Sequence, residues 1–202
     1  MIPLVLASAS PRRYALLSAL GIDVQVLASG VDEVDEGKEP AGIVIANAVA
    51  KRDDVAKRLE VPSLVIAADT LVFLGDEILS KPVDLDDARR MLRNLSGRSH
   101  EVVTGLAVVD TSTGQSAEGS ETTRVTFRDL ADEEIEHFVH AVKPVDRAGA
   151  YTVDGPGSLL VAGYEGCFQN VLGLPIVRLD RLLRTIGHNL FEIMDGPRAT
   201  FL

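Results

Sequence analysis

The sequence predicts an α/β fold. Segments with the spacing of strands and segments with the spacing of helices alternate along most of the 202 residues. Residues 64–68 form an uninterrupted apolar run, which is typical of a strand covered on both faces. Because 46% of the residues are hydrophobic, the chain can bury a substantial core, either as one large domain or as two small lobes.

The first elements are predicted from an apolar run and the residues that end it. Residues 4–7 are expected to form a strand, and the apolar period between residues 14 and 20 predicts a helix. Ser10 suits the N-cap of this helix, and Pro11 suits its first position, where the amide that proline lacks has no bond to lose. Gly21 is expected to end the helix.

The later elements follow from the same patterns. The expected strands are residues 24–27, 64–68, 102–110 and 121–127, together with a hairpin at residues 71–79 that turns at Gly75-Asp76. The expected helices are residues 41–59, 84–95 (capped by Asp84 and closed by Gly97), 131–142 and 176–186. Residues 149–157 form a glycine-rich loop. Residues 187–202 have no clear period and are expected to pack back on the body or to fray.

The overall charge and composition argue against several classes of protein. A formal net charge of -10 disfavours binding to nucleic acid or to acidic membrane surfaces. The single cysteine, Cys167, excludes an internal disulfide framework and a metal site made of several thiolates. Neither a secretory leader nor an apolar stretch of membrane-spanning length is found. We therefore expect a cytoplasmic protein without a membrane partner.

The segment from Ser8 to Arg13 is the first candidate site. A helix that starts at the end of a strand offers free N–H groups and a positive dipole end to an anion. Arg12 and Arg13 in the first turn oppose that dipole, a local cost that a bound phosphate would remove, and arginine can clamp phosphate oxygens bidentately. The alternative is a solvated helix start, and the cost to the dipole favours the anion site.

Carboxylates and lysines supply further candidates. Asp69 follows the buried run at residues 64–68, and a carboxylate there could hold a divalent cation or accept a proton from water; an N-cap or turn role is an equal alternative. Lys51 and Lys81 would individually be read as surface residues. The acidic residues of the loop at 31–40 are most simply solvated, although one or two could join a Mg²⁺ shell. They are Asp32, Glu33, Asp35 and Glu36.

Several reaction classes are disfavoured because their motifs are missing. The four histidines lack a metal-binding spacing such as HExxH, and no nucleophile elbow, Walker A or GxGxxG motif is present. The chemistry that remains is metal-assisted attack of water on a phosphoanhydride. It requires positive groups, a metal and a carboxylate that orients or deprotonates water, and the residues above provide each of these.

Six ordered motifs resemble those of the Maf family of nucleoside triphosphate pyrophosphatases. The first three are Ser8-Ala9-Ser10-Pro11-Arg12-Arg13, Ala68-Asp69-Thr70 and Lys81-Pro82. The others are Ser96-Gly97-Arg98-Ser99-His100, Arg147-Ala148-Gly149-Ala150-Tyr151 and Val171-Leu172-Gly173-Leu174-Pro175. The resemblance extends from about residue 4 to residue 183, and the order of six motifs makes it specific.

The resemblance implies a fold and a reaction. It implies an elongated, two-lobed domain over residues 1–186, with a mixed twisted sheet flanked by helices as in inosine triphosphatases, an active-site cleft between the lobes, and a tail at 187–202. The implied enzyme is a homodimeric hydrolase that releases pyrophosphate from nucleoside triphosphates with Mg²⁺ or Mn²⁺. The implied roles are proton acceptor for Asp69, phosphate contacts for Ser8, Arg13, Lys51 and Lys81, and metal ligands for Glu33 and Asp69.

The resemblance also bears on the base. Arg12 and Thr70 match the family branch that acts on dTTP and UTP rather than the branch that acts on 7-methyl-GTP. Asp154 departs from the first branch, which has glutamine there, and is closer to the acidic residue of the second. The exchange matters because an amide donates and accepts hydrogen bonds whereas a carboxylate only accepts. Two of three positions favour dTTP and UTP.

Two alternatives remain open at this point. One is a nucleotide-binding regulator of septum formation, a role with which the family is associated; a regulator would keep the phosphate site but would not need Asp69. The other is a purine house-cleaning pyrophosphatase of the related inosine-triphosphate fold, which would not require the Ser-Pro-Arg-Arg opening. Asp69 together with Arg13 and Lys81 favours catalysis.

Overall fold

Seven strands form one mixed sheet in the computed structural model, which describes residues 2–37 and 39–200. The strands are β1 (Leu4–Leu6), β2 (Val24–Val26), β3 (Leu64–Leu74), β4 (Glu77–Leu79), β5 (Ser99–Asp110), β6 (Ser116–Phe127) and β7 (Val161–Glu165). Their order is β2-β1-β3-β5-β6-β7, and β4 pairs with β3. The pairs β1–β2 and β1–β3 are parallel and the other pairs are antiparallel, which confirms the predicted α/β fold with a mixed sheet.

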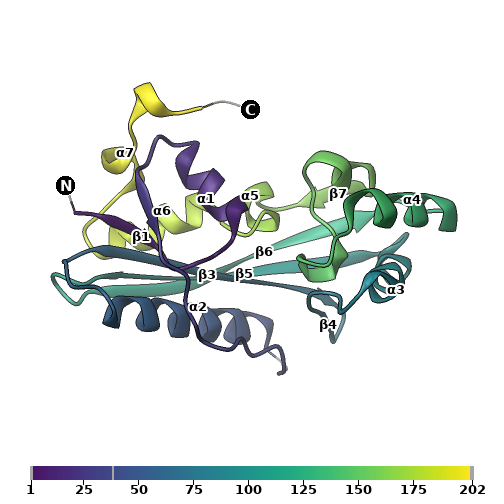
Figure 1. The fold of residues 1–202 in the computed structure, drawn as a ribbon, viewed down its shortest axis with the longest axis horizontal. Helices are drawn as coiled ribbons and strands as arrows, with labels where there is room; N and C mark the ends of the chain where they lie inside the picture. Colours follow the sequence, from purple (N-terminus) through teal and green to yellow (C-terminus); the bar gives the residue numbers. More distant parts are fainter. Residues whose placement is uncertain (1, 38, 201–202) are drawn as a thin grey trace.

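Helices cover both faces of this sheet. The α-helices are α1 (Pro11–Ser18), α2 (Pro40–Lys57), α3 (Leu85–Leu95), α4 (Asp132–Val142), α5 (Phe168–Val171), α6 (Ile176–Thr185) and α7 (Leu190–Ile193). Short 3-10 turns occur at η1 (Ala148–Ala150), η2 (Gly155–Leu159) and η3 (Gly196–Arg198). Figure 1 shows α2 on one face of the long strands and α1, α5 and α6 on the other.

The backbone of helix α2 lies directly against the sheet at Gly105. A Cβ added at Gly105 of β5 would lie 2.2 Å from the carbonyl oxygen of Val44 in α2, so only glycine fits there. This close approach lets the side chains of α2 reach the residues of β3, the neighbour of β5. The position of α2 therefore determines which of its side chains contact Asp69 of β3.

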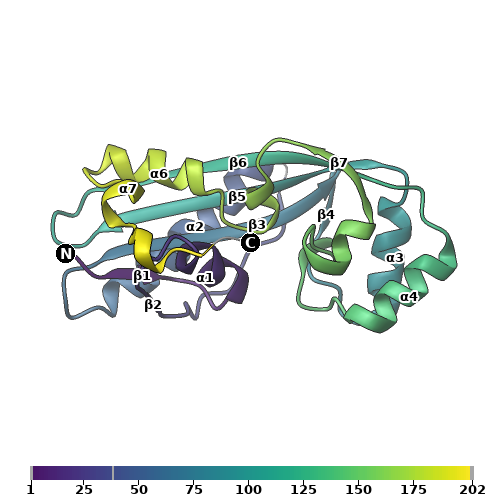
Figure 2. The same cartoon turned by 90° about the horizontal axis from the view of Figure 1, so that it is seen from above.

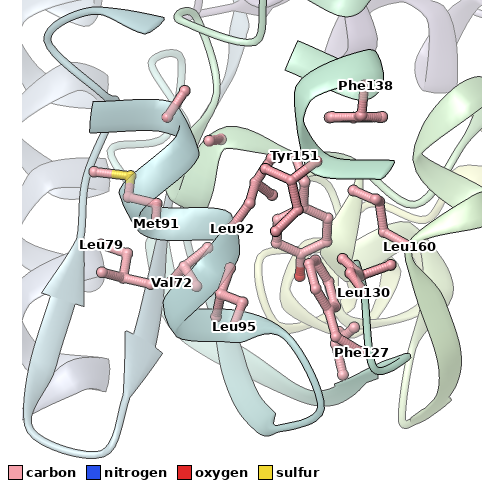
Figure 3. Packing of buried hydrophobic residues seen from close by; sticks show 14 of the residues in the cluster. Val72, Leu79, Met91, Leu92, Leu95, Phe127, Leu130, Phe138, Tyr151 and Leu160 are labelled. Carbon is pink, nitrogen blue, oxygen red and sulfur yellow. The ribbon is translucent and has the colours of Figure 1, made fainter. Parts of the chain in front are cut away.

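The molecule is elongated and has two lobes, as Figures 1 and 2 show. The core of the first lobe joins β1, α1 and α6 around residues such as Leu6, Leu17 and Leu179. The core of the second lobe lies between α3, α4 and the distal ends of the long strands, where Leu92, Phe127 and Tyr151 pack together (Figure 3). The long strands β3, β5 and β6 continue through both lobes, which makes the two lobes one domain.

Strand β3 differs from the prediction. Residues 64–68 were expected to form a strand that ends at Asp69, and residues 71–74 a separate hairpin strand. They are one strand of 11 residues, with Asp69 near its middle. The physical reason is that β5 pairs with residues 64–73 without interruption, so Asp69 and Thr70 stay in the ladder despite their polarity. The hairpin turn at Gly75 is confirmed, with a φ of 63°.

The outer edge of β3 has a gap. Strand β1 pairs with residues 64–66 of that edge, and β4 pairs with residues 72–74. Residues 67–71 therefore lie between the two partner strands. Because successive side chains of a strand point to opposite faces, Asp69 and Thr70 face opposite sides of the sheet at this gap.

The beginning and the end of the chain pack together. Leu190 is buried in the core of the first lobe, and the amide of Thr200 donates to the carbonyl of Ala19 at 3.0 Å. Gly21 follows α1 with a φ of 74°, and an added Cβ would lie 2.1 Å from the carbonyl oxygen of Asp195. Among the residues described, no helix combines the length and the apolar character that crossing a bilayer requires.

Candidate active site

A cleft of about 360 Å³ opens at the gap in the edge of β3. One wall is the turn from β1 into α1, from the first lobe. The opposite wall is the segment at residues 146–152, from the second lobe, in agreement with the cleft between lobes that the resemblance implies. Figure 2 shows α1 on one side of this region and α3 and β4 on the other.

The turn before α1 holds a serine and an arginine in one network. Ser10 takes the N-cap position, but its side chain makes no capping bond. The Oγ of Ser8 instead accepts from the amide of Ser10 at 3.2 Å and from Nη1 of Arg13 at 3.0 Å. Pro11 is the first residue of the helix, as predicted. The serine that organises this turn is therefore Ser8.

The guanidinium of Arg13 is fixed by three neutral acceptors. Its Nε donates to the carbonyl of Gly173 at 2.8 Å, and its Nη2 donates to Oγ1 of Thr70 at 3.0 Å. Burial lowers the pKa of Arg13, while the charges of Asp69 and Glu33 raise it. Arginine nevertheless remains protonated in proteins, so Arg13 presents a rigid, partly buried cation at the cleft, and no carboxylate of the described residues forms an ion pair with it. This is the arrangement that an anion needs.

Thr70 supports this arginine from β3. The hydroxyl of Thr104 donates to the carbonyl of Asn170 at 3.1 Å, and it lies 2.9 Å from Oγ1 of Thr70. Thr104 has only one hydroxyl hydrogen, so Thr70 donates to Thr104 and accepts from Arg13. Thr70 lines the cleft, and its hydroxyl hydrogen is used within the protein.

Two carboxylates share one ammonium on the other side of β3. Nζ of Lys51 lies 2.7 Å from Oδ1 of Asp69 and 2.6 Å from Oε1 of Glu33. Lys51 and Asp69 are buried, whereas Glu33 is exposed. Lys51 was individually read as a surface lysine from the sequence; the close packing of α2 instead turns it inward to β3.

The same helix supplies a buried amide that the sequence analysis missed. Oδ1 of Asn47 accepts from the amide of Val34, and Nδ2 donates to the carbonyl of Val34 and to Oδ2 of Asp69. Asn47 lies four residues before Lys51, which places both on one face of α2. An asparagine and a lysine four residues apart on a helix that precedes a strand with a buried aspartate are the sequence signal that would have indicated Asn47.

The carboxylate pair meets part of the requirement of a hard divalent cation. No group of three or more His, Cys, Asp and Glu side chains in the described residues could hold a metal ion by itself. Glu33 and Asp69 nevertheless converge on one cation, the ammonium of Lys51. Two carboxylates completed by phosphate oxygens and water are a common Mg²⁺ site, so the pair fits a metal that arrives with a phosphate substrate.

Charges of both signs also lie around Arg12 in the cleft. Nη1 of Arg12 lies 3.9 Å from Oδ2 of Asp146, and Arg147 also lines the cleft. Burial and Arg147 lower the pKa of Arg12, while Asp146 and Asp154 raise it. Asp154 is exposed and accepts a hydrogen bond from the hydroxyl of Thr152, which lines the cleft.

Lys81 completes the set of candidate residues. It follows β4, lies exposed at the cleft, and also borders a second hollow that shares Glu33 and Thr70 with the first. Each residue to which the resemblance gives a role thus lies at the cleft or, for Asp154, next to it, whereas Asp32, Asp35 and Glu36 do not line the cleft. Arg147 and Tyr151, which were not proposed individually, line it too.

Comparison with known proteins identifies the family. A family model described as Maf-like protein matches residues 3–186. The chain belongs to the Maf-like family. The family resemblance inferred from the six motifs is therefore confirmed.

Two curated relatives match this chain over almost the whole length of both proteins. The dTTP/UTP pyrophosphatase of Desulforamulus reducens is 43% identical over 187 residues, which covers 93% of this Maf-like chain and 98% of the relative. The dTTP/UTP pyrophosphatase of Acetivibrio thermocellus is 42% identical over 199 residues, which covers 95% and 99% of the two chains. A solved dITP/XTP pyrophosphatase from Mycobacterium abscessus overlaps only partly, with a TM-score of 0.41, 19% identity and coverage of 64% and 76%.

Proposed function

We propose that this protein hydrolyses dTTP and UTP to the nucleoside monophosphate and pyrophosphate, with a divalent cation. The observation that carries the proposal is the charge of the cleft. Its lining includes five cationic side chains and three acidic ones, although the whole chain has a formal net charge of -10. A local positive site on an acidic protein selects a small polyanion over a large one. The curated relatives named dTTP/UTP pyrophosphatase support the same reading.

The residues of the cleft have two roles in the proposed reaction, phosphate binding and proton transfer. Arg13 and Ser8, with Lys81 across the cleft, hold phosphate oxygens and orient the α-phosphorus toward water. Asp69 accepts a proton from that water, whose oxygen bonds to the α-phosphorus as the bond to the bridging oxygen breaks. Pyrophosphate leaves with the bridging oxygen, and Lys51 provides positive charge beside Asp69.

Glu33 and Asp69 are the residues that would hold a divalent cation. When bound, Mg²⁺ or Mn²⁺ would neutralise phosphate charge and polarise the phosphoryl oxygens. Lys51 occupies the place between the two carboxylates in this structure, so it would have to yield part of its contact to Glu33 or Asp69.

A second candidate substrate is 7-methyl-GTP, and Asp154 favours it. A carboxylate only accepts hydrogen bonds, and it therefore matches a base edge that presents N–H donors, as a guanine does. Arg12 and the dTTP/UTP names of the relatives favour the pyrimidine substrates. A non-catalytic regulator of septum formation is a third candidate. It would not need the contact of Lys51 with Asp69.

We also propose that the chain acts as a cytoplasmic homodimer, with a catalytic domain at 1–186 and a tail at 187–202. The acidic net charge supports a protein that binds neither nucleic acid nor an anionic membrane surface.

The deciding experiment is pyrophosphate release from dTTP, UTP, CTP, 7-methyl-GTP and ITP, each with Mg²⁺ and with a chelator. We expect dTTP and UTP to be the best substrates and Asp69→Asn to lower kcat by about 10²–10⁴-fold, the usual contribution of a positioned proton acceptor. Nucleotide binding without turnover by the wild type would favour the regulator. Full turnover by Asp69→Asn would remove Asp69 from the mechanism, and full turnover with chelator would remove the metal.

A further inference from the structure

We propose that Asn47 is a positioning residue that sets the distance between Glu33 and Asp69, and with it the affinity of the site for its divalent cation. The inference rests on the proposed function, because it concerns the carboxylate pair that would hold the metal. It adds a residue to which neither the sequence motifs nor the relatives' names give a role.

The first step is the contact with Asp69. Nδ2 of Asn47 donates to Oδ2 of Asp69 at 2.9 Å, and Nζ of Lys51 occupies Oδ1 at 2.7 Å. The two donors come from one helix and take one oxygen each. Asn47 therefore fixes the plane of the carboxylate and leaves Oδ1 as the oxygen that Lys51 and a metal would share.

The second step is the contact with the loop that carries Glu33. The amide of Val34 donates to Oδ1 of Asn47 at 2.9 Å, and Nδ2 donates to the carbonyl of Val34 at 2.7 Å. Both backbone groups of Val34 are thus bound by one side chain, directly after Glu33. The donor and acceptor pattern also fixes the amide orientation, because the flipped amide would place N–H against N–H.

The third step is that Asn47 is the rigid part of this link. It is 4% exposed and sits within α2, which packs tightly on β5. The loop has no helix or strand at residues 31–37, and Glu33 itself is exposed. A second tether is the hydroxyl of Ser80, which donates to Oδ2 of Asp35 at 2.7 Å; this bond is exposed and involves neither Asp69 nor the backbone groups of Val34.

A purely structural role makes a different prediction. A buried asparagine that only satisfies the backbone of Val34 would affect stability when replaced, with no specific effect on metal binding. A residue that orients metal ligands costs about 10–100-fold in metal affinity when it is lost. The two roles are therefore distinguished by measuring the affinity for the metal separately from the opening of the loop at Val34.

The test compares wild type, Asn47→Leu and Ser80→Ala. Leucine has nearly the shape of asparagine and removes all three hydrogen bonds, whereas Ser80→Ala loosens the same loop and leaves the contact with Asp69 intact. Mn²⁺ is titrated by electron paramagnetic resonance into each protein saturated with dUTP whose α,β-bridging oxygen is replaced by NH. Hydrogen exchange of the Val34 amide is followed by nuclear magnetic resonance.

We expect Asn47→Leu to raise the Mn²⁺ dissociation constant at least tenfold and to accelerate exchange at Val34, and Ser80→Ala to leave the constant within about threefold of wild type. Wild-type affinity in Asn47→Leu, or an equal loss in Ser80→Ala, would overturn the inference and leave the proposed function intact. A wild type that binds no Mn²⁺ would overturn both. If Asn47→Leu does not fold, Asn47→Ala is titrated with the same criteria.

Discussion

Lys51 and Asp69 form a buried ion pair of 2.7 Å between α2 and β3, and Glu33 reaches the same ammonium from a loop. Of the three, only Glu33 is exposed. The shared ammonium offsets the repulsion between two carboxylates that each have an oxygen within 2.7 Å of Nζ. The arrangement thus keeps together the two carboxylates that we propose as metal ligands.

The first prediction concerns the loss of this ammonium. Lys51→Met should lower the free energy of unfolding by about 3 kcal/mol in a chelator, because Asp69 then remains buried without its cation. Mg²⁺ should restore part of the loss by replacing the charge. Urea unfolding with and without Mg²⁺ measures both effects. The surface variant Lys57→Met serves as the control, and an equal loss with and without Mg²⁺ would contradict the prediction.

The second prediction concerns the fixed guanidinium of Arg13. Arg13→Lys keeps the charge but cannot reach Gly173, Ser8 and Thr70 together, because an ammonium is a point charge without the planar fork. We expect kcat/KM for dTTP to fall about 10²-fold, close to the usual effect of removing one donor to transition-state charge. Arg12→Lys is the matched variant and should lose less than tenfold. Steady-state rates of pyrophosphate release measure both effects. Equal losses in the two variants would refute the assignment of Arg13 as the fixed phosphate-binding guanidinium.

The third prediction concerns a buried histidine beside the cleft. Nε2 of His100 lies 2.6 Å from the hydroxyl of Tyr151, and burial lowers the pKa of His100 from 6.5 to about 4. The unfolded chain therefore binds a proton between pH 6.5 and pH 4 that the folded protein does not. The stability that depends on neutral His100 is therefore fully present above pH 6.5. As the pH falls toward 4 it is lost, and the free energy of unfolding decreases by on the order of 3 kcal/mol.

Urea unfolding of His100→Gln at pH 7.5 and pH 4.5 tests this linkage. The variant should lose less stability than the wild type between the two pH values, because glutamine does not titrate. His137→Gln, at an exposed site on α4, should behave as the wild type. Parallel pH dependence in wild type and His100→Gln would show that other groups cause the acid sensitivity.

The fourth prediction concerns Asp154. Its carboxylate raises the pKa of Arg12 and accepts from Thr152, so it adds negative charge next to the cleft. Asp154→Gln removes the charge and adds a donor, and we expect kcat/KM for dTTP and UTP to rise several-fold relative to 7-methyl-GTP. Competition assays with paired substrates measure the ratio. A lower rate for all three nucleotides would place Asp154 outside base selection.

The α/β class, most helices and strands, and the turn from Ser8 to Arg13 could be predicted from the sequence, which also offered Asp69 as a candidate residue. These features depend on periodicity, caps and turn residues, which act over a few positions of the chain. Three features are visible only in the folded protein: β3 runs through Asp69, Lys51 points inward to Asp69, and Asn47 joins Val34 to Asp69. Those facts depend on the pairing of β3 with β5 and on the approach of α2 to Gly105, which join residues far apart in sequence.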